Sequence, residues 1–315
     1  MAENNLFAEL PGSLWVAKSG VLRIPPEVSL AYVSCLEKHS LLESAKGDRP
    51  NPPPVGGYSQ EQTDLHFAHA FDGSVARVEL ALLDPHDQVA STSETLRRFL
   101  TGGSLCLVDV PCGAGAAALA LLGTTSSLRE AGLLPRVPLN VHIIGGEISA
   151  PARAYAEILL NGLKASWAAQ AIFVTQELTN WDVLSAVSNG ELVEKIILRK
   201  SESPQTLVIV SNFNGFLESS NKKKDAQPQL GELFKFASGL TNAAVWIEPI
   251  MNAASKGLFP WLKTAILKWA KFANLINSAD VDDTSECLFE LPAKPSSTAK
   301  VRLCVLPIEL VRSDA

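Results

Sequence analysis

Short apolar runs alternate with stretches of helical periodicity through the middle of this chain. Five such runs, at 104–110, 140–144, 171–175, 206–210 and 243–247, carry few polar side chains. A strand covered on both faces has this appearance, whereas a half-covered strand alternates apolar and polar residues. The pattern therefore predicts an α/β fold built on a doubly wound, mainly parallel sheet.

The last part of the chain has a different pattern. Two apolar runs, at 287–291 and 300–306, are joined by a short stretch rich in proline and serine, with no helical stretch between them. Only antiparallel neighbours can be joined by so short a connection. We therefore expect seven strands in total, with an antiparallel strand at the C-terminal end of the sheet.

Residues 1–103 are predicted to form a separate helical region, followed by a domain over 104–315. Helices are expected at 31–45, at 60–83 with a break at Asp72–Gly73, and at 92–101. Residues 48–57 contain three consecutive prolines, which suit neither a helix nor a central strand, so we interpret them as a linker or lid. His66 and His69 have a spacing that could hold a metal, but no third ligand is specified, and a solvated helix face is the preferred interpretation.

Composition narrows the class of protein. The chain is 47% hydrophobic and 19% charged with a net charge of −6, which excludes a generally basic protein that coats nucleic acid but not a local basic groove. The longest apolar stretch, 105–123, is interrupted by Asp109, Pro111 and glycines, so we expect no membrane span, and no signal peptide is recognised. Five cysteines without a CxxC pair indicate reduced thiols in a cytoplasmic protein.

The segment from Asp109 to Gly115 is the strongest candidate for ligand binding. It reads Asp-Val-Pro-Cys-Gly-Ala-Gly and lies between an expected strand and an expected helix. Glycines let the backbone approach a ligand closely, and a helix N-terminus contributes partial positive charge. Gly113, Gly115 and Ala118 also match the dinucleotide pattern GxGxxG/A, which is weak when it stands alone. A glycine-containing turn with a capping aspartate is the alternative that requires no ligand.

The aspartate four positions before Gly113 resembles the first motif of class I S-adenosylmethionine-dependent methyltransferases, D/E-x-G-x-G-x-G. Pro111 replaces the first glycine, and the variant D-x-x-C-G-x-G is similar to that of several nucleic-acid methyltransferases. In that family the carboxylate contacts the amino-acid end of the cofactor, directly or through water. The resemblance implies S-adenosyl-L-methionine as cofactor, a Rossmann-like domain ending in an antiparallel strand, and a binding loop formed by Asp109, Pro111, Gly113 and Gly115.

Two further segments extend the resemblance. Gly146-Glu-Ile-Ser resembles the family pattern G-D/E-h-S, which implies that Glu147 accepts hydrogen bonds from a ribose diol. Its distance from the loop is longer than usual because 124–138 reads as an insertion. Trp181 and Asp182 follow the third strand, where the family often binds adenine. Without the resemblance, these residues read as a carboxylate at a helix start, a packed indole and a helix cap.

Ser211, Asn212 and Phe213 follow the fourth strand. They resemble the start of the N/D-P-P-Y/F motif, in which amino-methyltransferases hold a target amine, but Phe213-Asn214-Gly215 stands where the prolines and aromatic residue would be. The resemblance implies that Ser211 contacts the cofactor and that Asn212 and Phe213 face the acceptor at the mouth of the site. The departure from the motif puts an amine on a base in doubt, and a strand-end asparagine turn is the alternative.

The resulting hypothesis is a methyltransferase without a metal that acts on nucleic acid. Basic residues support nucleic acid as the substrate. A helix starting near Pro260 would place Lys263, Lys268 and Lys271 opposite an apolar side, where they could contact phosphates. The other candidate contacts are Lys222, Lys223 and Lys224. Two alternatives stay open: a non-catalytic protein in which the fold serves binding or assembly, and a methyltransferase acting on small molecules or proteins. The sequence leaves the oligomeric state open.

Overall fold

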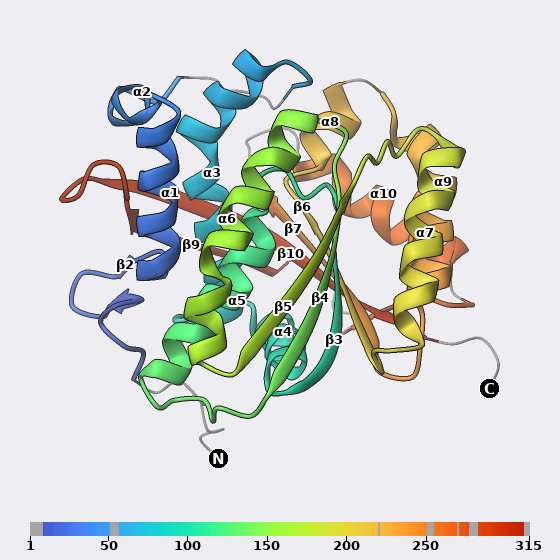
Figure 1. Ribbon diagram of the computed structural model, residues 1–315. Helices are drawn as coiled ribbons and strands as arrows, with labels where there is room; N and C mark the ends of the chain where they lie inside the picture. Colours follow the sequence, from blue (N-terminus) through green and yellow to red (C-terminus); the bar gives the residue numbers. More distant parts are fainter. Residues whose placement is uncertain are drawn as a thin grey trace.

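The computed structural model describes residues 9–50, 57–219, 221–250, 255–269, 271–276 and 283–311. Across these ranges the strands form one sheet in the order β1-β2-β9-β10-β7-β6-β3-β4-β5, with β8 beside β10 (Figure 1). Its central strands are all parallel. These are β3 (Gly103–Asp109), β4 (Leu139–Gly146), β5 (Ile172–Thr179), β6 (Gln205–Ser211) and β7 (Asn242–Pro249).

The antiparallel ending of the sheet is confirmed. The last strand, β10 (Thr298–Leu310), runs antiparallel to both β7 and β9 (Asp283–Glu290) and lies between them. The expected total of seven strands was wrong, because ten strands pair within the described ranges. The three additional ones are too short to leave a hydrophobic pattern in the sequence. They are β1 (Trp15–Val16), β2 (Val21–Leu22) and β8 (Asn274–Leu275).

Helices cover both faces of the sheet, as a doubly wound fold requires. Leu105 and Leu107 of β3 belong to one apolar cluster, whereas Cys106 and Val108 belong to another, because successive side chains of a strand point to opposite faces. The first face carries α1 (Pro26–Lys38), α3 (Gln60–Leu83), α4 (Ala90–Leu100), α5 (Ala116–Glu130) and α6 (Ala150–Ala169). The second carries α7 (Ala186–Lys200), α9 (Lys223–Ala237) and α10 (Ser255–Lys268) (Figure 1).

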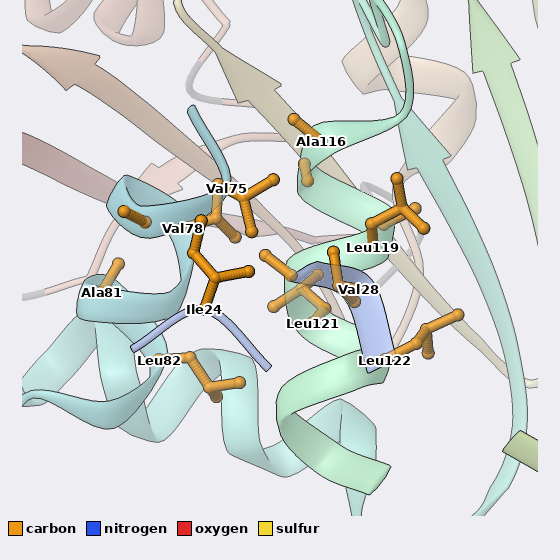
Figure 2. Packing of buried hydrophobic residues seen from close by; sticks show 14 of the residues in the cluster. Ile24, Val28, Val75, Val78, Ala81, Leu82, Ala116, Leu119, Leu121 and Leu122 are labelled. Atoms are coloured by element: carbon orange, nitrogen blue, oxygen red, sulfur yellow. The ribbon is translucent and has the colours of Figure 1, made fainter. Parts of the chain in front are cut away.

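The N-terminal helices share a core with the rest of the chain. Figure 2 shows apolar side chains of α3 facing those of α5, with Ile24 and Val28 packed among them. One apolar cluster therefore contains residues from both sides of the predicted boundary between 103 and 104. The division of the chain at that point stays a prediction.

Three helix boundaries differ from the sequence prediction. The helix expected at 31–45 is two helices, α1 and α2 (Leu42–Lys46), separated where Ser40 takes a φ of +58°. In contrast, α3 continues through Gly73 without a break. The Asn-Gly pair at 161–162 is a turn signal that predicts the end of a helix over 151–160, yet α6 continues past it. The expected insertion at 124–138 begins with the second half of α5. In α3 and α6, packing against neighbouring elements outweighs the local turn signals.

No helix in the described part of the chain combines the length and the apolar character needed to cross a membrane.

Candidate active site

Acidic and polar side chains gather at the carboxyl ends of the parallel strands. Asp109 is the last residue of β3, Glu147 follows β4, Ser211 ends β6, and Glu248 lies near the end of β7. In the sheet β3 has β4 on one side and β6 on the other. The chain therefore runs outward in one direction from β3 to β5 and in the other from β6 to β7. Open α/β sheets bind their ligands at such a switch point.

Asp109 is a buried carboxylate with little hydrogen bonding. It is 1% exposed, and its donor among the described residues is the backbone N–H of Ala118, which lies near but makes no hydrogen bond of ordinary geometry with either carboxylate oxygen. Burial raises its pKa to about 7, the nearby N–H of Ala118 opposes the shift in part, and the charge of Glu147 adds to it. A buried carboxylate of this kind costs free energy until a donor or a cation satisfies it.

The loop after Asp109 depends on two glycines with left-handed backbones. Gly113 has a φ of +52° and Gly115 a φ of +82°. A Cβ at Gly115 would lie 3.4 Å from the Cβ of Ala156, so glycine lets α5 begin close against α6. A Cβ at Gly113 would meet nothing within 4 Å, so its backbone faces open space. Pro111 is half-buried at the start of the same turn. This loop has the backbone exposure that a ligand needs.

Glu147 is held against the loop. Its Oε2 accepts a hydrogen bond from the N–H of Gly113 at 3.1 Å, and its Oε1 accepts one from the N–H of Ser149 at 2.8 Å. Burial raises the pKa of Glu147, and these N–H donors oppose the shift. The structure thus brings Glu147 and the glycine loop together, as the two motifs imply. Carboxylate oxygens accept more than one hydrogen bond each, so Glu147 keeps capacity for a diol.

Trp181 and Asp182 make structural contacts. The indole N–H of Trp181 donates to Oδ1 of Asn189 at 3.2 Å inside the second apolar cluster. Oδ1 of Asp182 accepts from the N–H of Leu184 at 2.9 Å, which is a turn contact. Their contact with adenine stays a prediction.

The segment after β6 is only partly accessible. Asn212 is half-buried with a φ of +55°, and Ser211 is buried. Phe213, which we expected at the mouth of the site, is 4% exposed and packs its ring against Trp181 and Phe216, with centroids 5.8 and 5.6 Å away. The assigned roles of these residues stay predictions, and the position of Asn212 suits contact with a ligand better than that of Phe213.

Glu248 was missed by the sequence analysis. Its Oε1 accepts from the N–H of Phe213 at 2.8 Å, from the N–H of Asn214 at 2.9 Å and from the indole N–H of Trp246 at 2.7 Å. Burial raises its pKa to about 7, and these donors oppose the shift. Glu248 thereby fixes the turn that carries Asn212. Its signal is an acid directly after the apolar run 243–247. Asp109 and Glu147 also stand at strand ends, but their resemblance to family motifs is what identified them.

Arg77 of α3 was also missed. Its Nε donates to Oδ1 of Asn212 at 2.9 Å, and its Nη2 donates to Oγ of Ser74 at 3.2 Å. Beside it, Arg49 forms an ion pair with Asp72, which is buried. No local motif marks Arg77, because its partner lies 135 residues further along the chain.

The two histidines do not form a solvated helix face, so that interpretation was wrong. His69 is buried with its Nε2 3.1 Å from Oγ of Ser44. His66 is half-buried, and burial together with the charge of Arg77 lowers its pKa to about 4. The packing of α3 against its neighbours covers both side chains. In the described ranges, no group of three or more His, Cys, Asp or Glu side chains is arranged to hold a metal ion.

The basic residues occupy the second face of the sheet. Nζ of Lys222 lies 4.2 Å from the ring centroid of Phe216, and Lys223 pairs with Glu218 at 2.9 Å. Lys224, Lys268 and Lys271 are exposed and Lys263 is half-buried. Helix α10 contains Pro260 rather than starting there. Its expected apolar side is confirmed as buried, with Leu262, Ile266, Trp269 and Ala273.

Several solved structures are similar to this chain at low scores. A SAM-dependent methyltransferase from Anabaena variabilis ATCC 29413 has a TM-score of 0.37 and 15% identity, covering 93% of this chain and 98% of that one. One from Agrobacterium tumefaciens has a TM-score of 0.35 and 11% identity, covering 71% and 62%. Loganic acid methyltransferase with SAH has a TM-score of 0.35 and 8% identity, covering 82% and 99%.

No protein-family model matches the chain. No curated protein matches it. Similarity at this level carries no argument about function, which must come from the residues of the site.

Proposed function

We propose that this chain is an S-adenosylmethionine-dependent methyltransferase whose cofactor binds across the carboxyl ends of β3 and β4. The observation that carries the proposal is Asp109, four positions before the open backbone of Gly113, whose two buried carboxylate oxygens have only the nearby N–H of Ala118 as a donor in the described structure. The ammonium group of the cofactor's amino-acid end would satisfy both the charge and the lone pairs of this carboxylate.

The remaining roles follow the order of the strands. Glu147, held 3.1 Å from the N–H of Gly113, is proposed to accept the ribose hydroxyls. Trp181 and Asp182 at the end of β5 are proposed to line the adenine, and Ser211 of β6 to lie beside the methionine portion. The antiparallel β10 also supports this family over a dinucleotide enzyme, whose sheet follows an all-parallel order.

Bound at this site, S-adenosylmethionine would supply a methyl group activated by its sulfonium. In such a transfer the acceptor's lone pair would form the new bond to the methyl carbon, and the electron pair of the S–C bond would stay on sulfur. The protein's task is then to position the acceptor, which can account for most of the rate enhancement. Asn212, fixed by Arg77 and by the turn that Glu248 holds, is proposed to orient that acceptor.

Cofactor binding by titration calorimetry tests the proposal. We expect S-adenosylhomocysteine to bind the wild-type protein, and Asp109→Asn to weaken binding roughly ten- to hundredfold, because a charged hydrogen-bond partner of the ligand is lost. Glu79→Gln is a matched control, since Glu79 is equally buried without partners for its oxygens but lies outside the site. This control should bind as the wild type does.

Two results would contradict the proposal in different ways. No binding by the folded wild-type protein would favour the non-catalytic alternative, in which the fold serves binding or assembly. Unchanged affinity in Asp109→Asn would remove Asp109 from the site while leaving the cofactor assignment standing.

A further inference from the structure

A second polar cluster lies on the other side of the switch point from Asp109. It consists of Arg77, Asn212, Arg49 and Asp72. The main cofactor motifs belong to β3 and β4, and Ser211 at the end of β6 is proposed to lie beside the methionine portion, whereas Asn212 lies one residue further on. If the cofactor occupies the β3–β4 side as far as Ser211, as proposed above, the space beyond Ser211 is left for the second reactant.

One face of α3 runs along this edge of the sheet. Residues three and four apart share a helix face, and the two ends of this face are tied to the sheet. Oγ1 of Thr63 lies 3.1 Å from Oγ of Ser149, just past β4, and Nε of Arg77 donates to Asn212, just past β6. About 21 Å of helix spans these two points at 1.5 Å per residue. The face carries Thr63, His66, Ala70, Gly73, Ser74 and Arg77.

The cluster offers hydrogen-bond donors. Arginine has donors only, so the Asn212 atom that faces Nε of Arg77 must be Oδ1, and the amide NH₂ of Asn212 is left to donate. Arg77 uses a second donor on the hydroxyl of Ser74. Its guanidinium has five N–H groups, so further donors remain. An amine target needs the opposite arrangement, in which the asparagine oxygen accepts.

The charges of the cluster also favour an anion. Among the described residues, Arg77 has no carboxylate within ion-pair distance, whereas Arg49 is paired with Asp72. The Nη1 atoms of both arginines lie 3.8 Å from the position that a Cβ of Gly73 would take, so two cations converge there. Burial and the charge of Arg49 lower the pKa of Arg77 to about 10, while Glu248 and Asp72 oppose the shift. Arg77 therefore stays charged at neutral pH.

We propose that Arg77 and Asn212 bind an anionic group, a carboxylate or a phosphate, of a small methyl acceptor. That the bound molecule is a methyl acceptor rests on the proposed function, whereas anion binding at Arg77 and Asn212 can be measured separately. A small acceptor is favoured because α3 is fastened at both ends of the face that borders the site. The exposed lysines that would suit a polynucleotide lie instead on and beside α9 and α10.

The test follows the side-chain Nε–Hε signal of Arg77 by NMR, assigned from its absence in Arg77→Gln. Benzoate and inorganic phosphate are titrated in the presence of saturating S-adenosylhomocysteine, so that the cofactor's own carboxylate subsite is filled. Benzamide, which has nearly the shape of benzoate without its charge, serves as the control probe. We expect benzoate or phosphate to shift the signal saturably and benzamide to leave it unchanged. No saturable shift with either anion would overturn the proposal.

Variants separate binding from folding. Arg77→Gln and Asn212→Ala should each weaken anion binding at least about tenfold, measured by calorimetry, and Arg77→Lys should retain part of it because the charge remains. Arg199→Gln is the control, since Arg199 pairs with Glu177 of the edge strand β5 and lies outside the cluster. Melting temperatures report whether each variant is folded. The titration of the wild-type protein tests the proposal without any variant.

Two further measurements decide the source of the anion. If Arg77→Gln weakens S-adenosylhomocysteine binding tenfold, the anion is the cofactor's carboxylate and the acceptor assignment is wrong. Transfer of labelled methyl groups from S-adenosylmethionine should reach the small-molecule fraction of a cell extract. Label that appears only in RNA, and is lost when Lys222 and Lys224 are replaced by glutamate, would overturn the proposal of a small acceptor in favour of a nucleic acid. Failure of the wild type to bind S-adenosylhomocysteine would contradict the proposed function alone.

Discussion

Three buried carboxylates at the carboxyl ends of β3, β4 and β7 have three different environments. Oε1 of Glu248 accepts three N–H groups and each oxygen of Glu147 accepts one, whereas in the described structure Asp109 has only the N–H of Ala118 nearby, outside ordinary hydrogen-bond geometry. All three have raised pKa values because burial disfavours the charged form. Glu248 and Glu147 therefore hold backbone turns in place, whereas Asp109 is available to bind a ligand.

Cofactor affinity should depend on pH through Asp109. Because burial raises its pKa to about 7, a cationic ligand must displace a proton below that pH. Affinity for S-adenosylhomocysteine should rise from pH 5 to 7, at most about tenfold per pH unit, and then level off. Calorimetry over this range should show a proton released on binding.

Two variants test the origin of this dependence. Asp109→Asn should flatten the pH profile between 5 and 7, whereas Glu147→Gln should retain most of it. Parallel profiles in the wild type and Asp109→Asn would assign the titration to another group.

How far the sequence could predict the site depends on where each residue's partner lies. Asp109 and Glu147 were predictable because their segments resemble family motifs, and both acids follow apolar runs. Glu248 also follows an apolar run and could have been found by that signal. Arg77 could not, because an arginine within a helix has no distinctive neighbour in sequence, and its contact with Asn212 exists only in the folded chain.

At the scale of elements, strands were easier to predict than helix ends. The five central strands are apolar because they are covered on both faces, a property that the sequence shows directly. Helix α6 passes through Asn161 and Gly162 because α1 and β5 pack along its length, and Asn161 is engaged by Gln176 of β5. Local turn signals carry no information about such neighbours, so tertiary packing decided where α5 and α6 end.

Ser149 connects helix capping to the site. Its Oγ accepts from the N–H of Ala152 at the start of α6 and also lies 3.1 Å from Thr63 of α3. Ser149→Ala should lower the free energy of unfolding by about 1 kcal/mol, as is typical for a lost N-cap. It should also weaken S-adenosylhomocysteine binding severalfold, because the Glu147 turn loses its tie to α3.

Ser93 provides the control for this prediction. Its Oγ donates to the carbonyl oxygen of Leu82 at 2.6 Å, which links α4 to α3 through two residues that have no proposed role in the site. Ser93→Ala should cost about 1 kcal/mol of free energy of unfolding, measured by urea denaturation, with no change in ligand affinity. Equal effects of both variants on affinity would mean that Ser149 acts through general stability.

For the whole molecule, the buried acids predict a stability that falls as the pH rises. Burial raises the pKa values of Asp109 and Glu248 to about 7 and that of Glu79 well above its usual range. At a pH between the pKa of the unfolded state and that of the folded state, the native protein holds a proton that the unfolded chain has lost. Raising the pH in this interval therefore favours unfolding. Burial lowers the pKa of the buried histidines, which oppose this effect only below about pH 6.5.

The free energy of unfolding should therefore fall by about 2–4 kcal/mol between pH 6.5 and 8. Urea denaturation at several pH values measures the slope. Glu79→Gln and Glu248→Gln should each reduce it, because each removes one titrating group from the native core. A free energy of unfolding that rises over this interval would contradict the proposed protonation of these side chains.

The position of β10 has a consequence for how the chain reaches its fold. Within the described ranges, β2 pairs with β9, β9 pairs with β10, and β10 alone joins them to β7. The ion pair between Arg23, just after β2, and Glu290, at the end of β9, links residues 267 positions apart. During synthesis on the ribosome, the first strands emerge long before their partners exist. High contact order of this kind slows folding, because loop closure precedes the contacts that repay it. Until residues 283–311 arrive, β7 remains an open edge on which a nascent chain can aggregate.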